Sequence, residues 1–146
     1  MKISDLLSPD DIMVDARTSQ KGPLLQELAT RAAASLGLPA EQVASYLSRR
    51  EELGSTGIGN GIAIPHARLP DLKRPYGLVA KLKQGIEFDA IDGQAVDVVF
   101  VLLLPAATES DALAALALVA RTLRSPDTRA RLRAAKNPAE VHAALA

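Results

Sequence analysis

The chain has 146 residues, of which 48% are hydrophobic, and it carries 17 basic and 17 acidic residues. This length is usual for one compact domain, so we expect a single domain over residues 1–146 with a substantial buried core. The balanced charge and the aromatic content of only 3% argue against nucleic acid as a partner, because its binders need a basic surface and often stack bases on aromatic rings.

The residue types that are missing narrow the chemistry and the compartment. The absence of cysteine excludes disulfides, thiolate nucleophiles and zinc–thiolate sites. Residues 1–5 lack the pattern of a secretory signal. The longest apolar runs, 98–104 and 112–120, are shorter than the roughly 20 residues that span a bilayer. We therefore expect a cytoplasmic location without membrane insertion.

The first third of the chain predicts two helices after a short segment at residues 3–7. Pro23 suits the first position of a helix, and Gly37 is placed to end it. A second helix is expected to follow Pro39 and to end at Gly54. Apolar residues at helical spacing mark the first helix: Leu24, Leu25, Leu28, Ala29, Ala32 and Leu36. The stripe of the second consists of Val43, Tyr46, Leu47, Arg50 and Leu53.

Three strands are predicted in the middle of the chain. Residues 62–65 form a short apolar run that ends at a proline, and residues 77–82 alternate as strands do. Residues 96–104 are almost wholly apolar, which is typical of a strand covered on both faces.

Helices return towards the C-terminus. Residues 111–123 are apolar on most sides, which indicates a helix packed against the sheet, and shorter helices are expected to open at residues 125–127 and 137–138. Helices followed by strands and then by more helices predict an α/β sandwich, in which helices flank a mixed β-sheet.

A glycine-rich segment at residues 54–61 is the most informative feature of the sequence. It contains four glycines in eight residues, which favours a loop and excludes regular helix or strand. Consecutive backbone N–H groups in such a loop can form a concave binding site for an anion such as phosphate. His66 follows shortly after this loop. The segment therefore places a nucleophilic side chain beside a predicted anion site.

Two nucleotide-binding loops are excluded by the spacing. A P-loop requires Gly-Lys-Ser/Thr, but Gly59 and Gly61 are followed here by Asn60 and Ile62. The dinucleotide fingerprint, counted from Gly57 and Gly59, requires its third glycine where the chain has Ile62.

The run Gly-Ser-Thr-Gly-Ile-Gly-Asn-Gly-Ile-Ala-Ile-Pro-His-Ala at residues 54–67 resembles the active-site signature of one protein family. That family is the mannitol/fructose class (type 2) of enzyme IIA domains in the bacterial phosphoenolpyruvate-dependent phosphotransferase system. The glycine-rich part is most similar to the nitrogen-regulatory branch. The resemblance continues through residues 86–92, 118–120 and 131–135.

The resemblance implies a phosphohistidine relay in which a histidine phosphocarrier protein donates a phosphoryl group to His66. Neutral imidazole is a competent nucleophile near neutral pH. Arg50 matches a family arginine and is expected to pair with the phosphoryl oxygens, and Ser55, Thr56 and Gly57 are expected to bind the same oxygens. No cofactor and no metal is expected, because the chain has two histidines far apart in sequence.

Simpler interpretations of these residues stay open. Arg50 would also complement the dipole of the helix that ends beside it. Ser55 and Thr56 are typical turn residues that satisfy their own backbone. In the same way, the only role of the glycines would be to shape a bend in the backbone.

The chain departs from the family at one position. Family members commonly carry a second histidine where this chain has Ala112, and the other histidine of the chain, His142, lies near the C-terminus. An alanine can neither donate a hydrogen bond to a phosphoryl oxygen nor hold the ring of the partner histidine, so this chain lacks those contributions to phosphotransfer, and His66 remains the expected acceptor.

We therefore predict a phosphocarrier and regulatory domain, with regulatory proteins as further partners. One alternative is a sugar-specific, fructose/mannitol-type enzyme IIA that feeds a permease. A second alternative, suggested by Ala112, is a protein-binding module that is no longer phosphorylated.

Overall fold

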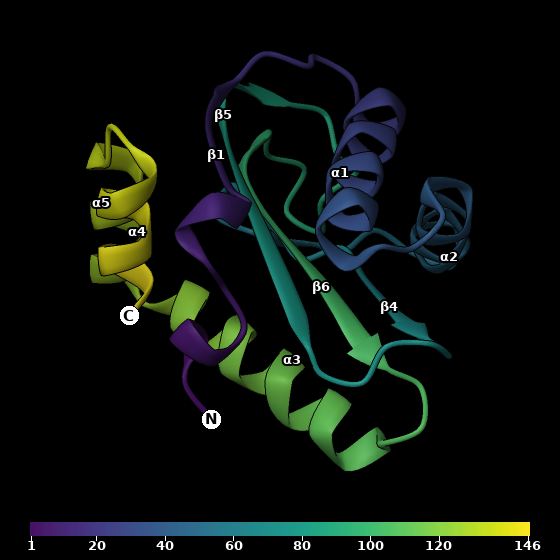
Figure 1. Ribbon diagram of the computed structural model, residues 1–146. Coiled ribbons are helices and arrows are strands. Elements are labelled where there is room, and N and C mark those ends of the chain that lie inside the picture. The colour runs from purple at the N-terminus through teal and green to yellow at the C-terminus, as the bar shows by residue number, and fades with distance from the viewer.

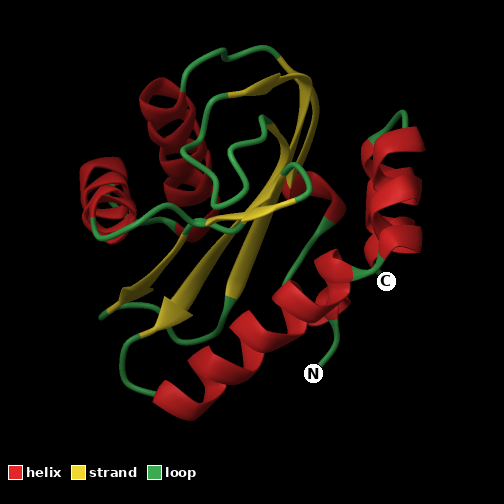
Figure 2. Cartoon of the chain, turned by 180° about the vertical axis from the view of Figure 1, so that it is seen from behind, coloured by secondary structure: helices red, strands yellow, loops and turns green.

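The computed structural model describes all residues from Met1 to Ala146. A six-stranded mixed sheet has the order β1-β5-β6-β3-β2, and β4 also pairs with β6. Figure 1 shows α1 and α2 on one side of this sheet and α3, α4 and α5 on the other, and Figure 2 shows the same arrangement from behind. The prediction of a mixed sheet flanked by helices is confirmed.

The strands are β1 (Ile12–Ala16), β2 (Gly57–Gly59), β3 (Ile62–Ala63), β4 (His66–Leu69), β5 (Tyr76–Ile86) and β6 (Val96–Pro105). The helices are α1 (Lys21–Leu36), α2 (Ala40–Glu52), α3 (Glu109–Arg124), α4 (Pro126–Ala134) and α5 (Pro138–Leu145), with short 3₁₀ turns at Ile3–Asp5 and Pro9–Asp11. None of these helices combines the length and the hydropathy that crossing a bilayer requires.

Strand β6 is the centre of the fold. It pairs antiparallel with β5 and parallel with β3 and β4. Its side chains alternate between two buried clusters, as the strand period of two residues requires. Val99, Val101 and Leu103 pack in the cluster that contains α1 and α2. Val98, Phe100, Leu102 and Leu104 pack in the cluster that contains α3 and α5. The prediction that this strand is covered on both faces is confirmed.

The first two helices differ from the predicted ones at their ends. α1 begins at Lys21, so Pro23 is its third residue and not its first. Gly37 ends the helix as predicted, with a left-handed φ of 69° that costs glycine little. Leu53 was expected on the buried stripe of α2 but is 85% exposed, because the helix ends at Glu52.

The two C-terminal helices begin where the sequence predicts. Ser125 caps α4 and Asn137 caps α5, each through a side-chain oxygen that accepts a first-turn N–H at 3.3 and 2.9 Å. Such caps satisfy N–H groups that have no partner within the helix.

The prediction of a loop throughout residues 54–61 is wrong at residues 57–59, which form β2. Strand β2 pairs antiparallel with β3. Asn60 and Gly61 connect the two strands with φ angles of 58° and 79°. Positive φ at both positions of a two-residue connection suits a tight hairpin, and Asn-Gly is a favoured sequence for it.

The sequence pattern did not reveal β1 and β4. Strand β1 lies at the edge of the sheet, where Asp15 adopts a positive φ of 60° and breaks the alternation. Strand β4 has only four residues. His66 is its first residue and lies opposite Leu102 of β6, so a strand holds the histidine at its start.

Because Phe100 is fully buried beneath the helices on the α3 side, its truncation should leave a cavity. We expect Phe100→Ala to lower the free energy of unfolding by about 3–5 kcal/mol, measured by urea denaturation. Leu113→Ala is the control, since Leu113 is 61% exposed on α3, and should change this free energy by no more than about 0.5 kcal/mol. Equal losses in the two variants would contradict the two-cluster description.

Candidate functional site

The candidate site centres on His66, whose side chain is half-buried at the start of β4. Its Nδ1 lies 2.9 Å from the carbonyl oxygen of Ile64. A carbonyl can only accept a hydrogen bond, so Nδ1 carries the proton in this contact. The neutral ring therefore has its free electron pair on Nε2.

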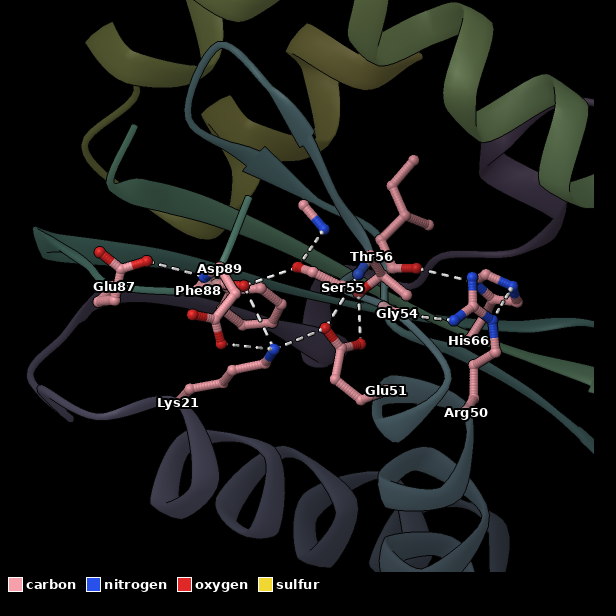
Figure 3. A network of polar contacts seen from close by, with 12 residues as sticks. Lys21, Arg50, Glu51, Gly54, Ser55, Thr56, His66, Glu87, Phe88 and Asp89 are labelled. Atoms are coloured by element: carbon pink, nitrogen blue, oxygen red, sulfur yellow. Dashed lines mark hydrogen bonds and ion pairs between the residues drawn. The ribbon is translucent and has the colours of Figure 1, made fainter. Parts of the chain in front are cut away.

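The second ring nitrogen faces Arg50, which lies in the last turn of α2. Arg50 donates from Nε to His66 Nε2 at 3.3 Å and from Nη1 to the Gly54 carbonyl at 2.9 Å (Figure 3). The first bond requires an electron pair on Nε2, which agrees with the proton position inferred from Ile64. Arg50 thus brings a positive charge and donor groups to the nitrogen that can act as a nucleophile.

The surroundings keep the imidazole neutral. Burial lowers the pKa of His66 below its ordinary value, and the Arg50 charge lowers this pKa further. The hydrogen bond to Ile64 and the charge of Glu51 act in the opposite direction. The net direction is downward, so at neutral pH the ring retains the electron pair that an attack requires.

A buried carboxylate lies on the other side of the α2 terminus. Glu51 is 8% exposed, and it accepts the Thr56 N–H at Oε1 (2.9 Å) and the Thr56 hydroxyl at Oε2 (2.7 Å). Lys21 Nζ lies 3.0 Å from Glu51 Oε1. The same ammonium donates to the Phe88 carbonyl at 3.2 Å and lies 4.7 Å from the centre of the Phe88 ring. Figure 3 shows that Arg50 contacts His66 and Gly54, whereas Glu51 contacts Thr56 and Lys21.

Ser55 and Gly57 join the same loop to the segment around Phe88. The Ser55 hydroxyl donates to the Phe88 carbonyl at 2.6 Å and accepts the Gly57 N–H at 3.1 Å. A side chain at Gly57 would place its Cβ 2.7 Å from Ala90 Cβ and 2.8 Å from Ala90 Cα. Glycine is required here because the backbones of the two segments approach so closely.

The structure therefore separates the predicted site residues into two groups. Arg50 contacts His66 directly. Ser55 and Thr56 lie on the adjoining loop and Gly57 begins β2, and their hydroxyl or N–H donors are engaged by acceptors of the protein itself. Their assignment as phosphoryl ligands stays a prediction.

Sequence reasoning missed Glu51 and Lys21. One signal was present, because a carboxylate in the last turn of a helix opposes the helix dipole, and Glu51 occupies such a position in α2. An unfavourable charge of this kind indicates that a tertiary partner compensates it. The partner, Lys21, is 30 residues away in the sequence, so no local pattern identifies it.

The other positions singled out in the sequence contribute no side chain to the contacts of His66. Ala112 is buried in the first turn of α3. The His142 ring nitrogen Nε2 lies 3.2 Å from the Leu7 carbonyl. No group of three or more histidine or carboxylate side chains is arranged to hold a metal ion.

Comparisons with known proteins identify the family of this chain. Residues 5–146 match the family described as phosphoenolpyruvate-dependent sugar phosphotransferase system, EIIA 2. A protein of Bradyrhizobium diazoefficiens named nitrogen regulatory protein is 42% identical over 146 residues, covering 100% of this chain and 95% of that protein.

Solved structures show the same fold. The crystal structure of the nitrogen regulatory protein IIA-Ntr from Neisseria meningitidis superposes with a TM-score of 0.93 at 31% identity, and covers 99% of both chains. The mannitol IIA of Escherichia coli superposes with a TM-score of 0.79 over 96% of this chain and 99% of that chain, and its 19% identity supports the fold alone. From the match over residues 5–146 and the identity over the full chain, we conclude that this protein belongs to the EIIA 2 family of the phosphoenolpyruvate-dependent phosphotransferase system.

Proposed function

We propose that the chain is a phosphocarrier and regulatory domain of the nitrogen branch of the phosphotransferase system, acting in the cytoplasm. In this proposal His66 accepts a phosphoryl group from a phosphorylated histidine carrier protein. The observation that carries it is the free electron pair of Nε2, held beside the Arg50 guanidinium while Nδ1 is bound to Ile64. The names of the related nitrogen regulatory proteins support the choice of branch.

The transfer requires one bond to form and one to break. The His66 Nε2 electron pair attacks phosphorus, the N–P bond of the donor histidine breaks, and its electron pair returns to the donor nitrogen. The Nδ1 proton stays in its hydrogen bond to the Ile64 carbonyl, which stabilises the positive charge that develops on the ring. Catalysis in such a transfer consists mainly of positioning and charge stabilisation.

Arg50 supplies the charge stabilisation in this mechanism. Its Nε–H points at Nε2 in the unphosphorylated protein, and the same group can donate to a phosphoryl oxygen once the N–P bond occupies Nε2. A charged donor pairs strongly with phosphate oxygens. Ser55, Thr56 and Gly57 belong to the proposal as the loop that borders the phosphoryl group, and direct bonds from their donors would require them to leave their present acceptors.

The output of the domain follows from the charge change. A phosphoryl group adds roughly −1.5 to −2 charges beside Arg50 and so changes which protein surfaces can dock there. Regulatory proteins that distinguish the two states are the proposed downstream partners.

Phosphoryl transfer to His66 can be tested with a histidine carrier protein that bears a radiolabelled phosphoryl group. The native chain should acquire acid-labile label, and His66→Ala should acquire none, because it lacks the nucleophile. His142→Ala is the matched control and should be labelled as the native chain is. Label that persists on His66→Ala would refute the assignment, and an unlabelled native chain would favour the protein-binding alternative.

Loss of the Arg50 guanidinium should slow the transfer step. We expect Arg50→Gln to reduce the maximal rate of phosphorylation by about 100-fold, the usual effect of removing one preorganised donor from a developing charge. Arg49→Gln provides the control, since Arg49 is exposed on the same turn and contacts the Tyr46 ring. Quenched-flow kinetics with a saturating concentration of the phosphorylated carrier protein measures both rates. Similar rates for the two variants would exclude the proposed role of Arg50.

The depressed pKa of His66 predicts a pH profile. Because the neutral ring is the nucleophile, the rate should be constant near neutral pH and should fall once the pH drops below this lowered pKa. Arg50→Gln removes a charge that lowers the pKa, so its decline should begin at a higher pH. The pKa itself is measurable by NMR titration of the His66 ring; an unchanged value in Arg50→Gln would contradict the electrostatic account.

A further inference from the structure

A closed circuit of contacts connects the end of α2 to both nitrogens of the His66 ring. The Glu51 carboxylate accepts both donors of Thr56. The Thr56 carbonyl accepts the N–H of Ile64 at 3.0 Å, and the Ile64 carbonyl accepts His66 Nδ1 at 2.9 Å. Arg50, the covalent neighbour of Glu51, then contacts His66 Nε2. The peptide of Ile64 is therefore held at its N–H by the loop that Glu51 anchors.

Lys21 completes this arrangement electrostatically. A carboxylate removed from water is costly unless it has hydrogen bonds and a counter-charge. Glu51 has both, through Thr56 and through Lys21 at 3.0 Å. The Lys21 side chain is 20% exposed and is held in place by Phe88, whose ring and carbonyl it contacts.

We propose that Lys21 and Glu51 are positioning residues for phosphoryl transfer, and that they act by fixing the proton position and orientation of the His66 imidazole. This inference rests on the proposed function of His66 as the acceptor. The ionised carboxylate offers a separate oxygen to each of the two Thr56 donors, whereas an amide of the same shape has only one oxygen that can accept. Without it Thr56 and the Ile64 peptide lose their anchor, and the proton is no longer confined to Nδ1.

The expected kinetic effect lies in the transfer step. Glu51 is buried, and the ammonium group of Lys21 is already engaged by the Glu51 carboxylate and the Phe88 carbonyl, so we do not expect either side chain to bind the incoming carrier protein. A loss of orientation at His66 therefore lowers the maximal rate and leaves the apparent KM for the carrier protein unchanged. Groups that orient a metal-ligating histidine contribute a factor of about 10 to 100, and we expect a factor of similar size for groups that orient His66.

Glu51→Gln and Lys21→Met test the proposal, with ¹⁵N NMR of the His66 ring in the unphosphorylated protein as the first readout. The native ring should show a protonated Nδ1 and an unprotonated Nε2. Both variants should shift the ring towards a mixture of the two tautomers. Their maximal rates of phosphorylation should fall by about 10- to 100-fold with KM changed less than twofold. Lys21→Arg, which keeps the charge, should restore most of the rate.

Asp97→Asn is the matched control. Asp97 pairs with Arg133 at 3.0 Å, and Arg133 also donates to the Asn60 carbonyl. This ion pair therefore stabilises the same β2–β3 hairpin but is not one of the contacts that connect Glu51 with His66. The control should leave the tautomer and the rate as in the native chain. A native tautomer ratio in Glu51→Gln and Lys21→Met, or an equal rate loss in Asp97→Asn, would overturn the proposal.

The NMR readout separates this inference from the proposed function. If the native chain accepts no phosphoryl group, the proposed function fails, while the tautomer measurement still decides whether Lys21 and Glu51 control the ring. Should Glu51→Gln fail to fold, Lys21→Met answers the same question, since it removes the counter-charge from a partly exposed side chain.

Discussion

The hydrogen bond from His66 Nδ1 to the Ile64 carbonyl is the interaction on which the site depends. It assigns the proton to Nδ1 and leaves the electron pair on Nε2. The Nε atom of Arg50 lies 3.3 Å from Nε2. A ring with the opposite tautomer would present an N–H to Arg50 and could not attack phosphorus through Nε2. The backbone sets this choice without any acidic or basic side chain touching Nδ1.

That backbone is rigid because of where it lies in the sheet. Strand β3 pairs with β6 just before Ile64, and β4 pairs with β6 from His66 onward. Strand β6 is in turn packed on both faces by the two buried clusters. A reactive group on such a support needs little reorganisation when the partner arrives. The His66 side chain itself is only half-buried, as the proposed transfer between two proteins requires.

Charge is distributed unevenly around the end of α2. Arg50 and Glu51 are adjacent in the sequence, yet Arg50 donates a hydrogen bond to the His66 ring, and Glu51 accepts one from Thr56 of the loop. The buried anion is compensated by Lys21 from the first turn of α1, so helices α1 and α2 both contribute to the same site. Arg50 is the charged side chain that contacts Nε2, whereas Ala112 is buried in the first turn of α3.

The sequence by itself determined the fold class and the buried strand at residues 96–104, and it singled out His66 and Arg50 as candidate site residues, because periodicity and a local signature are encoded by neighbouring residues. Only the tertiary structure decided that Gly57–Gly59 is a strand, since an edge strand this short depends on its pairing partner. The same holds for Lys21 and Glu51. Their ion pair joins residues that are remote in the chain. Burial of the Glu51 carboxylate makes a counter-charge necessary, and burial is a property of the packed protein and not of any segment.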